Sequence, residues 1–214
     1  MSNIKYPLTV IDGRVIKLTE AFSWLLHYVD PNKKNPNIKT IVFDMTCSEM
    51  IMWKLSDFEY FKVITNDIRK GVKADYHKCC SQLYKLPLKV HIVIYDPPYY
   101  NKKNRKDDKH RIQVYGYNMM ETLEQLESLT QDTAMSSYGL LKENGILIAK
   151  ITDFHYGKDE ELRGSFDFRE WFSDYFVLQD DYIYRFYKPI PNLGQYSKKS
   201  AITHSHFMIF KPRK

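Results

Sequence analysis

Residues 90–99 read Val-His-Ile-Val-Ile-Tyr-Asp-Pro-Pro-Tyr, an apolar run that ends in an aspartate, two prolines and an aromatic residue. Proline lacks an amide donor and has a fixed φ, so Pro97 and Pro98 should stop a strand and hold Asp96 extended at its end. Asp-Pro-Pro followed by an aromatic residue arises by chance in only roughly a few chains per thousand. The stretch therefore predicts a buried strand that presents a carboxylate at the edge of a sheet.

Two earlier stretches repeat this design. Residues 40–44 form a short β-branched run that ends in Asp44, and residues 62–67 form another that ends in Asp67. Because ligands collect beyond the carboxyl ends of strands in open α/β sheets, Asp44, Asp67 and Asp96 are expected to converge at one edge.

The remaining pattern alternates helices with strands. Helices are predicted over residues 14–29, 49–58, 118–141 and 167–175, and further strands over 146–151, 176–185 and 204–211, after turns at 142–145 and 192–200. Strands separated by helices imply parallel crossovers, whereas a hairpin-length final turn implies an antiparallel last strand. The sequence predicts a single α/β domain over residues 1–214, with a mostly parallel sheet and helices on both faces.

Net charge is +6, and much of the excess lies in a basic loop over residues 101–118. Its basic residues are Lys102, Lys103, Arg105, Lys106, Lys109 and Arg111. This charge, together with nearby tyrosines, favours a nucleic-acid partner. A lysine-rich loop that only keeps the protein soluble would have the same composition, so charge supports this partner without establishing it.

Other features narrow the setting. The three cysteines form neither a disulfide framework nor a zinc pattern, and no apolar run approaches the roughly 20 residues of a membrane helix. We therefore expect a soluble, cytoplasmic protein with no membrane partner. His204 and His206 alternate on the last predicted strand, but no third ligand is identifiable, and no metal is predicted.

The motif Asp96-Pro97-Pro98-Tyr99 resembles the hallmark of the S-adenosylmethionine-dependent DNA amino-methyltransferases, which act on adenine N6 or cytosine N4. The resemblance implies a Rossmann-like, seven-stranded methyltransferase fold, S-adenosylmethionine as cofactor, and these four residues as the catalytic centre. The Asp96 carboxylate and the Pro97 carbonyl would accept the amino protons, and Tyr99 would stack on the base. The alternative is that the double proline is only a turn signal.

The same resemblance implies the cofactor site. Asp44-Met-Thr-Cys-Ser-Glu49 stands where the family has a glycine-rich turn, but Ser48 and Met50 occupy its glycine positions. Glycine matters there because the backbone must approach the cofactor closely and can require φ > 0. Asp67 would bind the ribose hydroxyls, and Asp75 would lie near the adenine ring. The implied cofactor-binding residues are Asp44, Met45, Thr46, Cys47, Ser48, Asp67, Ile68, Asp75 and Asp96.

Three functions remain open at this stage. The first is methylation of DNA, with adenine N6 favoured over cytosine N4, in which Tyr99 and the six basic residues of the loop contact the nucleic acid. The second is amino-methylation of a base in tRNA or rRNA. The third is a nucleic-acid-binding relative without catalysis, which the missing glycines motivate.

Overall fold

The computed structural model describes residues 9–35, 37–97, 122–152, 154–156, 160–162, 164–190 and 202–214. Its strands are β1 (Thr9–Asp12), β2 (Thr40–Asp44), β3 (Phe61–Thr65), β4 (Val90–Tyr95), β5 (Leu141–Ile151), β6 (Phe154–Tyr156), β7 (Glu160–Leu162), β8 (Phe176–Ile190) and β9 (Ile202–Pro212). Its helices are α1 (Leu18–Val29), α2 (Asp57–Tyr60), the 3-10 helix η1 (Cys80–Lys85), α4 (Leu123–Leu140) and α5 (Gly164–Trp171).

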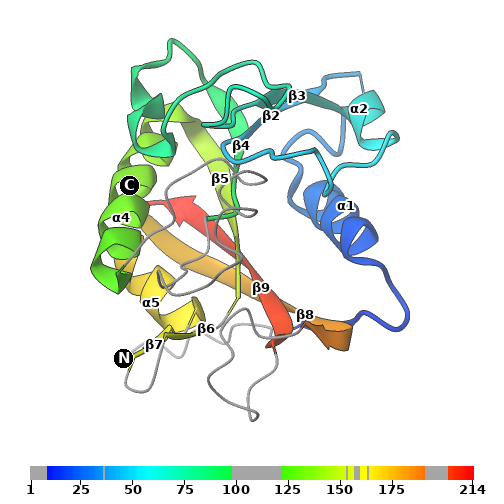
Figure 1. Ribbon diagram of the computed structural model, residues 1–214. Coiled ribbons are helices and arrows are strands. Elements are labelled where there is room, and N and C mark those ends of the chain that lie inside the picture. The colour runs from blue at the N-terminus through cyan, green and yellow to red at the C-terminus, as the bar shows by residue number, and fades with distance from the viewer. Residues whose placement is uncertain are drawn as a thin grey trace.

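Seven strands form one sheet in the order β1-β8-β9-β5-β4-β2-β3, and β6 and β7 form a separate small ribbon. The pairings β1–β8, β2–β3, β2–β4 and β4–β5 are parallel, whereas β9 runs antiparallel to both of its neighbours, β5 and β8 (Figure 1). This confirms a mostly parallel seven-stranded sheet with an antiparallel C-terminal strand. The carboxyl ends of β2, β3 and β4 meet at the same edge.

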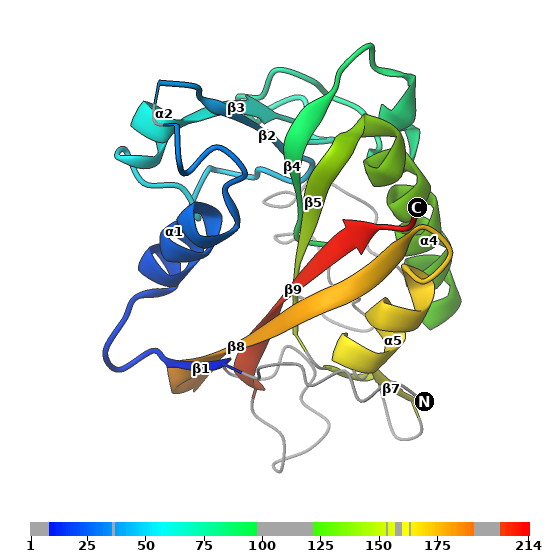
Figure 2. The ribbon, with the colours of Figure 1, turned by 180° about the vertical axis from the view of Figure 1, so that it is seen from behind.

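Helices cover the sheet on both sides, as expected. Helix α1 lies on one face, and α4 and α5 lie on the other (Figures 1 and 2). The two hydrophobic clusters follow the alternation of side chains along β5. Ile146 and Ile148 belong to the cluster of α1, while Leu147 and Ala149 belong to the cluster of α4 and α5. The stretch of β5 from Ile146 to Ala149 is therefore apolar on both faces.

Several element boundaries differ from the sequence prediction. The helix predicted over residues 49–58 is wrong, because this stretch consists of turns that end in the single-turn helix α2. Here Met50 has a positive φ, and the side chain of Asp57 accepts a hydrogen bond from the Lys54 amide at 2.9 Å, so local bonds compete with a helix. Residues 142–145, predicted as a turn, belong to β5.

Further differences from the sequence prediction concern strand β1 and the ends of β8 and α5. Strand β1 was not predicted, because its four residues are too short to show a period, and it forms only by pairing with β8. Strand β8 continues to Ile190, and α5 begins at Gly164 rather than at residue 167. The turn predicted over residues 192–200 lies outside the described residues. None of the described helices is long and apolar enough to span a membrane.

Candidate active site

The loop that follows β2 connects the ends of three strands. The Thr46 hydroxyl accepts a hydrogen bond from the Asp96 amide at 2.8 Å, which joins this loop to the end of β4. The Cys47 amide donates to the Asn66 carbonyl at 3.0 Å, and the Asn66 side chain donates to the Met45 carbonyl at 2.9 Å, which joins it to the end of β3. The ends of the three strands that carry the predicted carboxylates are thus held together.

Asp44 is buried at the centre of this arrangement. One carboxylate oxygen accepts from the Thr46 amide at 3.1 Å, and the other accepts from the indole Nε1 of Trp53 at 2.8 Å. Burial raises the pKa of Asp44 to about 6, against the effect of these two hydrogen bonds, and the negative charges of Asp96 and Asp67 raise it further. Asp96 and Asp67 are therefore both close enough to Asp44 to act on it electrostatically.

The positions where the resemblance calls for glycine keep a glycine-like backbone. Ser48 has φ 49° and Met50 has φ 59°, and these are the non-glycine residues of the described chain with positive φ. The left-handed region costs about 1–2 kcal/mol for a residue with a Cβ. The backbone is therefore left-handed at both positions although neither residue is a glycine.

Asp67 is engaged by its own neighbours. Its Oδ1 accepts from the amide and the Nε of Arg69, each at 2.9 Å, and its Oδ2 accepts from Nη2 of Arg69 at 2.8 Å and from the Ser48 amide at 3.1 Å. Both side chains are nearly buried, with exposed fractions of 7% for Asp67 and 10% for Arg69. Burial opposes ionisation, but the hydrogen bonds from Arg69 outweigh it and lower the pKa of Asp67.

Asp75 is hydrogen-bonded to Thr65, the last residue of β3. Its Oδ2 accepts from the amide and the hydroxyl of Thr65 at 2.8 and 2.9 Å, and its own amide donates to that hydroxyl at 3.0 Å. The adjacent residue Tyr76 forms an isolated parallel bridge with Asn66. These contacts give Asp75 a part in shaping the loop, whereas its contact with an adenine ring remains a prediction. Ile68, in the same segment, is exposed.

Lys150, near the end of β5, completes the site and was missed by the sequence reasoning. Its ammonium lies 2.8 Å from Oδ2 of Asp96, with side-chain exposures of 12% for Lys150 and 30% for Asp96. A lysine inside the apolar strand Ile146–Ile151 was the available signal, because a buried cation requires a partner. Asp96 is therefore held from both sides, through its amide by Thr46 and through its carboxylate by Lys150.

Part of the predicted machinery lies outside the described residues. Pro97 is described and buried, but Pro98 and Tyr99 are not described. The same holds for the whole basic loop over residues 101–118, with all six of its predicted nucleic-acid contacts. The roles of these residues stay predictions.

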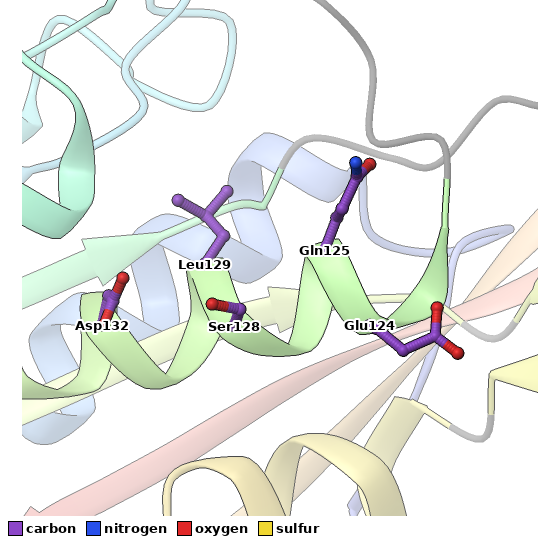
Figure 3. Close-up of a pocket in the computed structure, with 5 residues that line it drawn as sticks. All are labelled: Glu124, Gln125, Ser128, Leu129 and Asp132. Atoms are coloured by element: carbon purple, nitrogen blue, oxygen red, sulfur yellow. The ribbon is translucent and has the colours of Figure 1, made fainter.

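Two other features share no residue with this site. A shallow hollow on α4 is lined by Glu124, Gln125, Ser128, Leu129 and Asp132 (Figure 3). It includes no residue predicted for the site, and its two acids do not suit a phosphate. Nδ1 of His206 lies 3.0 Å from both carboxylate oxygens of Asp181, which gives this buried histidine a structural partner. Within the described ranges, no group of three or more His, Cys, Asp or Glu residues could hold a metal ion.

Comparison with known proteins gives the fold and not a family. No protein-family model and no curated protein sequence matches the chain. Solved structures match at low identity. TrmN from Thermus thermophilus is 11% identical, with a TM-score of 0.54 over 91% of this chain and 49% of that protein. This chain thus spans about half the length of TrmN.

Two further structures match over most of both chains. The 1,6-didemethyltoxoflavin-N1-methyltransferase from Burkholderia thailandensis, solved with 1,6-didemethyltoxoflavin and S-adenosylhomocysteine, is 10% identical, with a TM-score of 0.51 over 92% of this chain and 79% of that one. A TehB-like S-adenosylmethionine-dependent methyltransferase from Corynebacterium glutamicum is 9% identical, with a TM-score of 0.50 over 90% and 87%. The chain therefore has the Rossmann-like fold of S-adenosylmethionine-dependent methyltransferases.

Proposed function

We propose that this chain is an S-adenosylmethionine-dependent methyltransferase that modifies the exocyclic amino nitrogen of a base in DNA, adenine N6 in preference to cytosine N4. The observation that carries the proposal is the position of Asp96. It follows β4 directly, precedes Pro97, and is bonded to the loop after β2 on one side and to Lys150 on the other. A methyltransferase fold with an oriented carboxylate at this edge suits amino-group chemistry.

The loop after β2 and the end of β3 fit the proposed cofactor in two respects. The positive φ of Ser48 and Met50 gives the loop a backbone path that allows close approach of a ligand. The carboxylates of Asp44 and Asp96 suit a ligand that carries positive charge. When bound, S-adenosylmethionine supplies a methyl group activated by its sulfonium. The residues proposed to hold it are those from Asp44 to Ser48, with Asp67, Ile68, Asp75 and Asp96.

The acceptor chemistry follows from the groups around Asp96. The lone pair of an exocyclic amine is delocalised into the ring, so hydrogen-bond acceptors on its two protons restore nucleophilic character to the nitrogen. The Asp96 carboxylate and the Pro97 carbonyl are the proposed acceptors, and Tyr99 the stacking partner of the base. The nitrogen–methyl bond would form as the methyl–sulfur bond breaks, with the neutral thioether as leaving group, and one proton of the nitrogen would leave to the carboxylate or to water. Lys150 positions the carboxylate for this task.

The proposed substrate side depends on the basic loop. Its six lysines and arginines support phosphate contacts, and a base in a duplex would have to leave the stack to reach Asp96, at a cost of a few kcal/mol. Amino-methylation of a base in RNA uses the same chemistry. The labelling experiment described next distinguishes it from DNA methylation. One observation favours a non-catalytic nucleic-acid-binding protein, namely that Arg69 and the Ser48 amide together already fill the hydrogen-bonding capacity of Asp67.

The decisive experiment is transfer of labelled methyl from S-adenosylmethionine to unmethylated DNA and to total RNA, followed by mass spectrometry of the nucleosides. We expect N6-methyldeoxyadenosine. Asp96→Asn should abolish transfer and weaken cofactor binding only slightly, because the other proposed cofactor contacts remain, whereas Asp132→Asn, a change at an exposed position of α4, should retain both. Label in RNA alone would replace DNA by RNA as the substrate. Full activity of Asp96→Asn would refute the catalytic role of this carboxylate.

A further inference from the structure

The carboxylate of Asp67 has no hydrogen-bonding capacity left. A carboxylate offers about four lone-pair positions, two on each oxygen. Backbone amides fill one position on each oxygen, from Arg69 on Oδ1 and from Ser48 on Oδ2. The guanidinium of Arg69 fills the second position on each, with Nε on Oδ1 at 2.9 Å and Nη2 on Oδ2 at 2.8 Å. The side chain of one residue thus takes both positions that a pair of ligand hydroxyls would need.

A second bond holds the guanidinium in this place. Nη2 of Arg69 also donates to the Ser48 hydroxyl at 2.9 Å. Ser48 stands at a backbone position with φ 49°, where glycine would be favoured and would offer no hydroxyl. The unusual serine and the arginine therefore form one unit with Asp67, and the strain at Ser48 is accompanied by a bond that only a side chain there can make.

We infer that Arg69 closes the subsite for the ribose of the cofactor, so that the two ribose hydroxyls bind Asp67 only when the guanidinium fork is displaced. The inference rests on the proposed cofactor. A vicinal diol presents two donors to the two oxygens of one carboxylate, which is also the geometry of a bidentate arginine. The diol and the guanidinium fork therefore compete for the same acceptors, and Arg69 lowers the affinity for any ligand that carries a ribose.

Calorimetry with S-adenosylmethionine and S-adenosylhomocysteine tests this without any activity assay. Arg69→Met retains an unbranched side chain but removes the guanidinium fork. This variant should bind both ligands about tenfold more tightly, equivalent to ~1.4 kcal/mol. Arg69→Lys should fall between this variant and the wild type, because an ammonium cannot bind both oxygens as a fork. Ser48→Ala removes the second anchor and should tighten binding by a smaller factor.

The matched control is an S-adenosylhomocysteine analogue that lacks the 2′ and the 3′ hydroxyl of the ribose. It cannot use the two positions that Arg69→Met vacates, so its affinity should not improve in this variant. Unchanged or weaker binding of S-adenosylhomocysteine to Arg69→Met would overturn the inference, and weaker binding would make Arg69 a direct ligand contact. If Arg69→Met does not fold, the affinities of Ser48→Ala and the wild type for S-adenosylhomocysteine are compared instead. Tighter binding by Ser48→Ala supports the inference, and equal or weaker binding overturns it. Absence of binding to the wild type and all variants would overturn the proposed function itself.

Discussion

The pKa of Asp44 predicts a specific dependence of stability on pH. Burial raises this pKa from the ordinary value of 3.8 to about 6. Between about pH 4 and pH 6 the folded protein therefore keeps a proton on Asp44 that the unfolded chain has lost. Stability from this group is fully present below about pH 4 and is lost as the pH rises through about 6. Since a tenfold change in proton affinity equals ~1.4 kcal/mol, the loss amounts to about 3 kcal/mol.

The perturbation that isolates this contribution is Asp44→Asn. Asparagine cannot ionise, but it also offers fewer acceptors to the Trp53 indole and the Thr46 amide, so the variant should be less stable than the wild type near pH 4. As the pH rises to 7, the wild type loses the contribution of Asp44 and the variant does not. The difference between the two should therefore shift by about 3 kcal/mol in favour of the variant.

Urea unfolding followed by far-ultraviolet circular dichroism at half-unit steps from pH 4 to pH 8 measures this difference. Carboxylates away from Asp44 titrate alike in both proteins and cancel in the comparison, and Asp67, whose pKa is lowered, titrates below this pH range. The difference curve should bend near pH 6. Two parallel stability curves over the whole range would refute the assignment of a raised pKa to Asp44.

Three further outcomes follow from bonds and angles of the site. Lys150→Met should lower the free energy of unfolding by about 1–2 kcal/mol and slow methyl transfer by about tenfold to a hundredfold, and Lys150→Arg should restore part of both. Urea titration measures the first effect and single-turnover kinetics the second. Unchanged transfer in Lys150→Met would show that Lys150 is not part of the site. Thr46→Val, which removes the acceptor for the Asp96 amide, should cost about 1 kcal/mol by the same titration, and a neutral result would mean that water replaces the hydroxyl. Met50→Gly should be more stable than Met50→Ala by about 1 kcal/mol in thermal unfolding, because φ is 59° at this position; the reverse order would contradict the left-handed backbone.

Six of the seven strands in the large sheet follow well from local sequence, whereas their order in the sheet appears only in the folded chain. Short apolar runs that end in Asp44 and Asp96 are buried on both faces, and this pattern is strong because the two helical layers leave no face of β2 or β4 in water. The stretch 49–58 shows the limit of such reasoning. Its apolar residues suit a helix, but side-chain bonds such as that of Trp53 to Asp44 fix turns instead.

The candidate site divides in a similar way. The three acids were predictable, because each ends or closely follows a strand and the parallel order brings these strand ends together. Their partners were not, because Lys150 lies 54 positions from Asp96 and meets it only through the pairing of β4 with β5. Arg69, only two positions from Asp67, was close enough to notice, yet only the folded loop shows that its fork fills both carboxylate oxygens.

Strand β9 has a consequence for the order in which the molecule can assemble. It is hydrogen-bonded to β5 on one side and to β8 on the other, so β8 and β1 join the remaining sheet only through it. Every one of its partners precedes it in the chain. On a ribosome, β8 would therefore emerge before the strand that pairs it with the rest of the sheet. Residues 202–212 therefore complete the sheet last, and such late, long-range strand pairing predicts slow, cooperative folding.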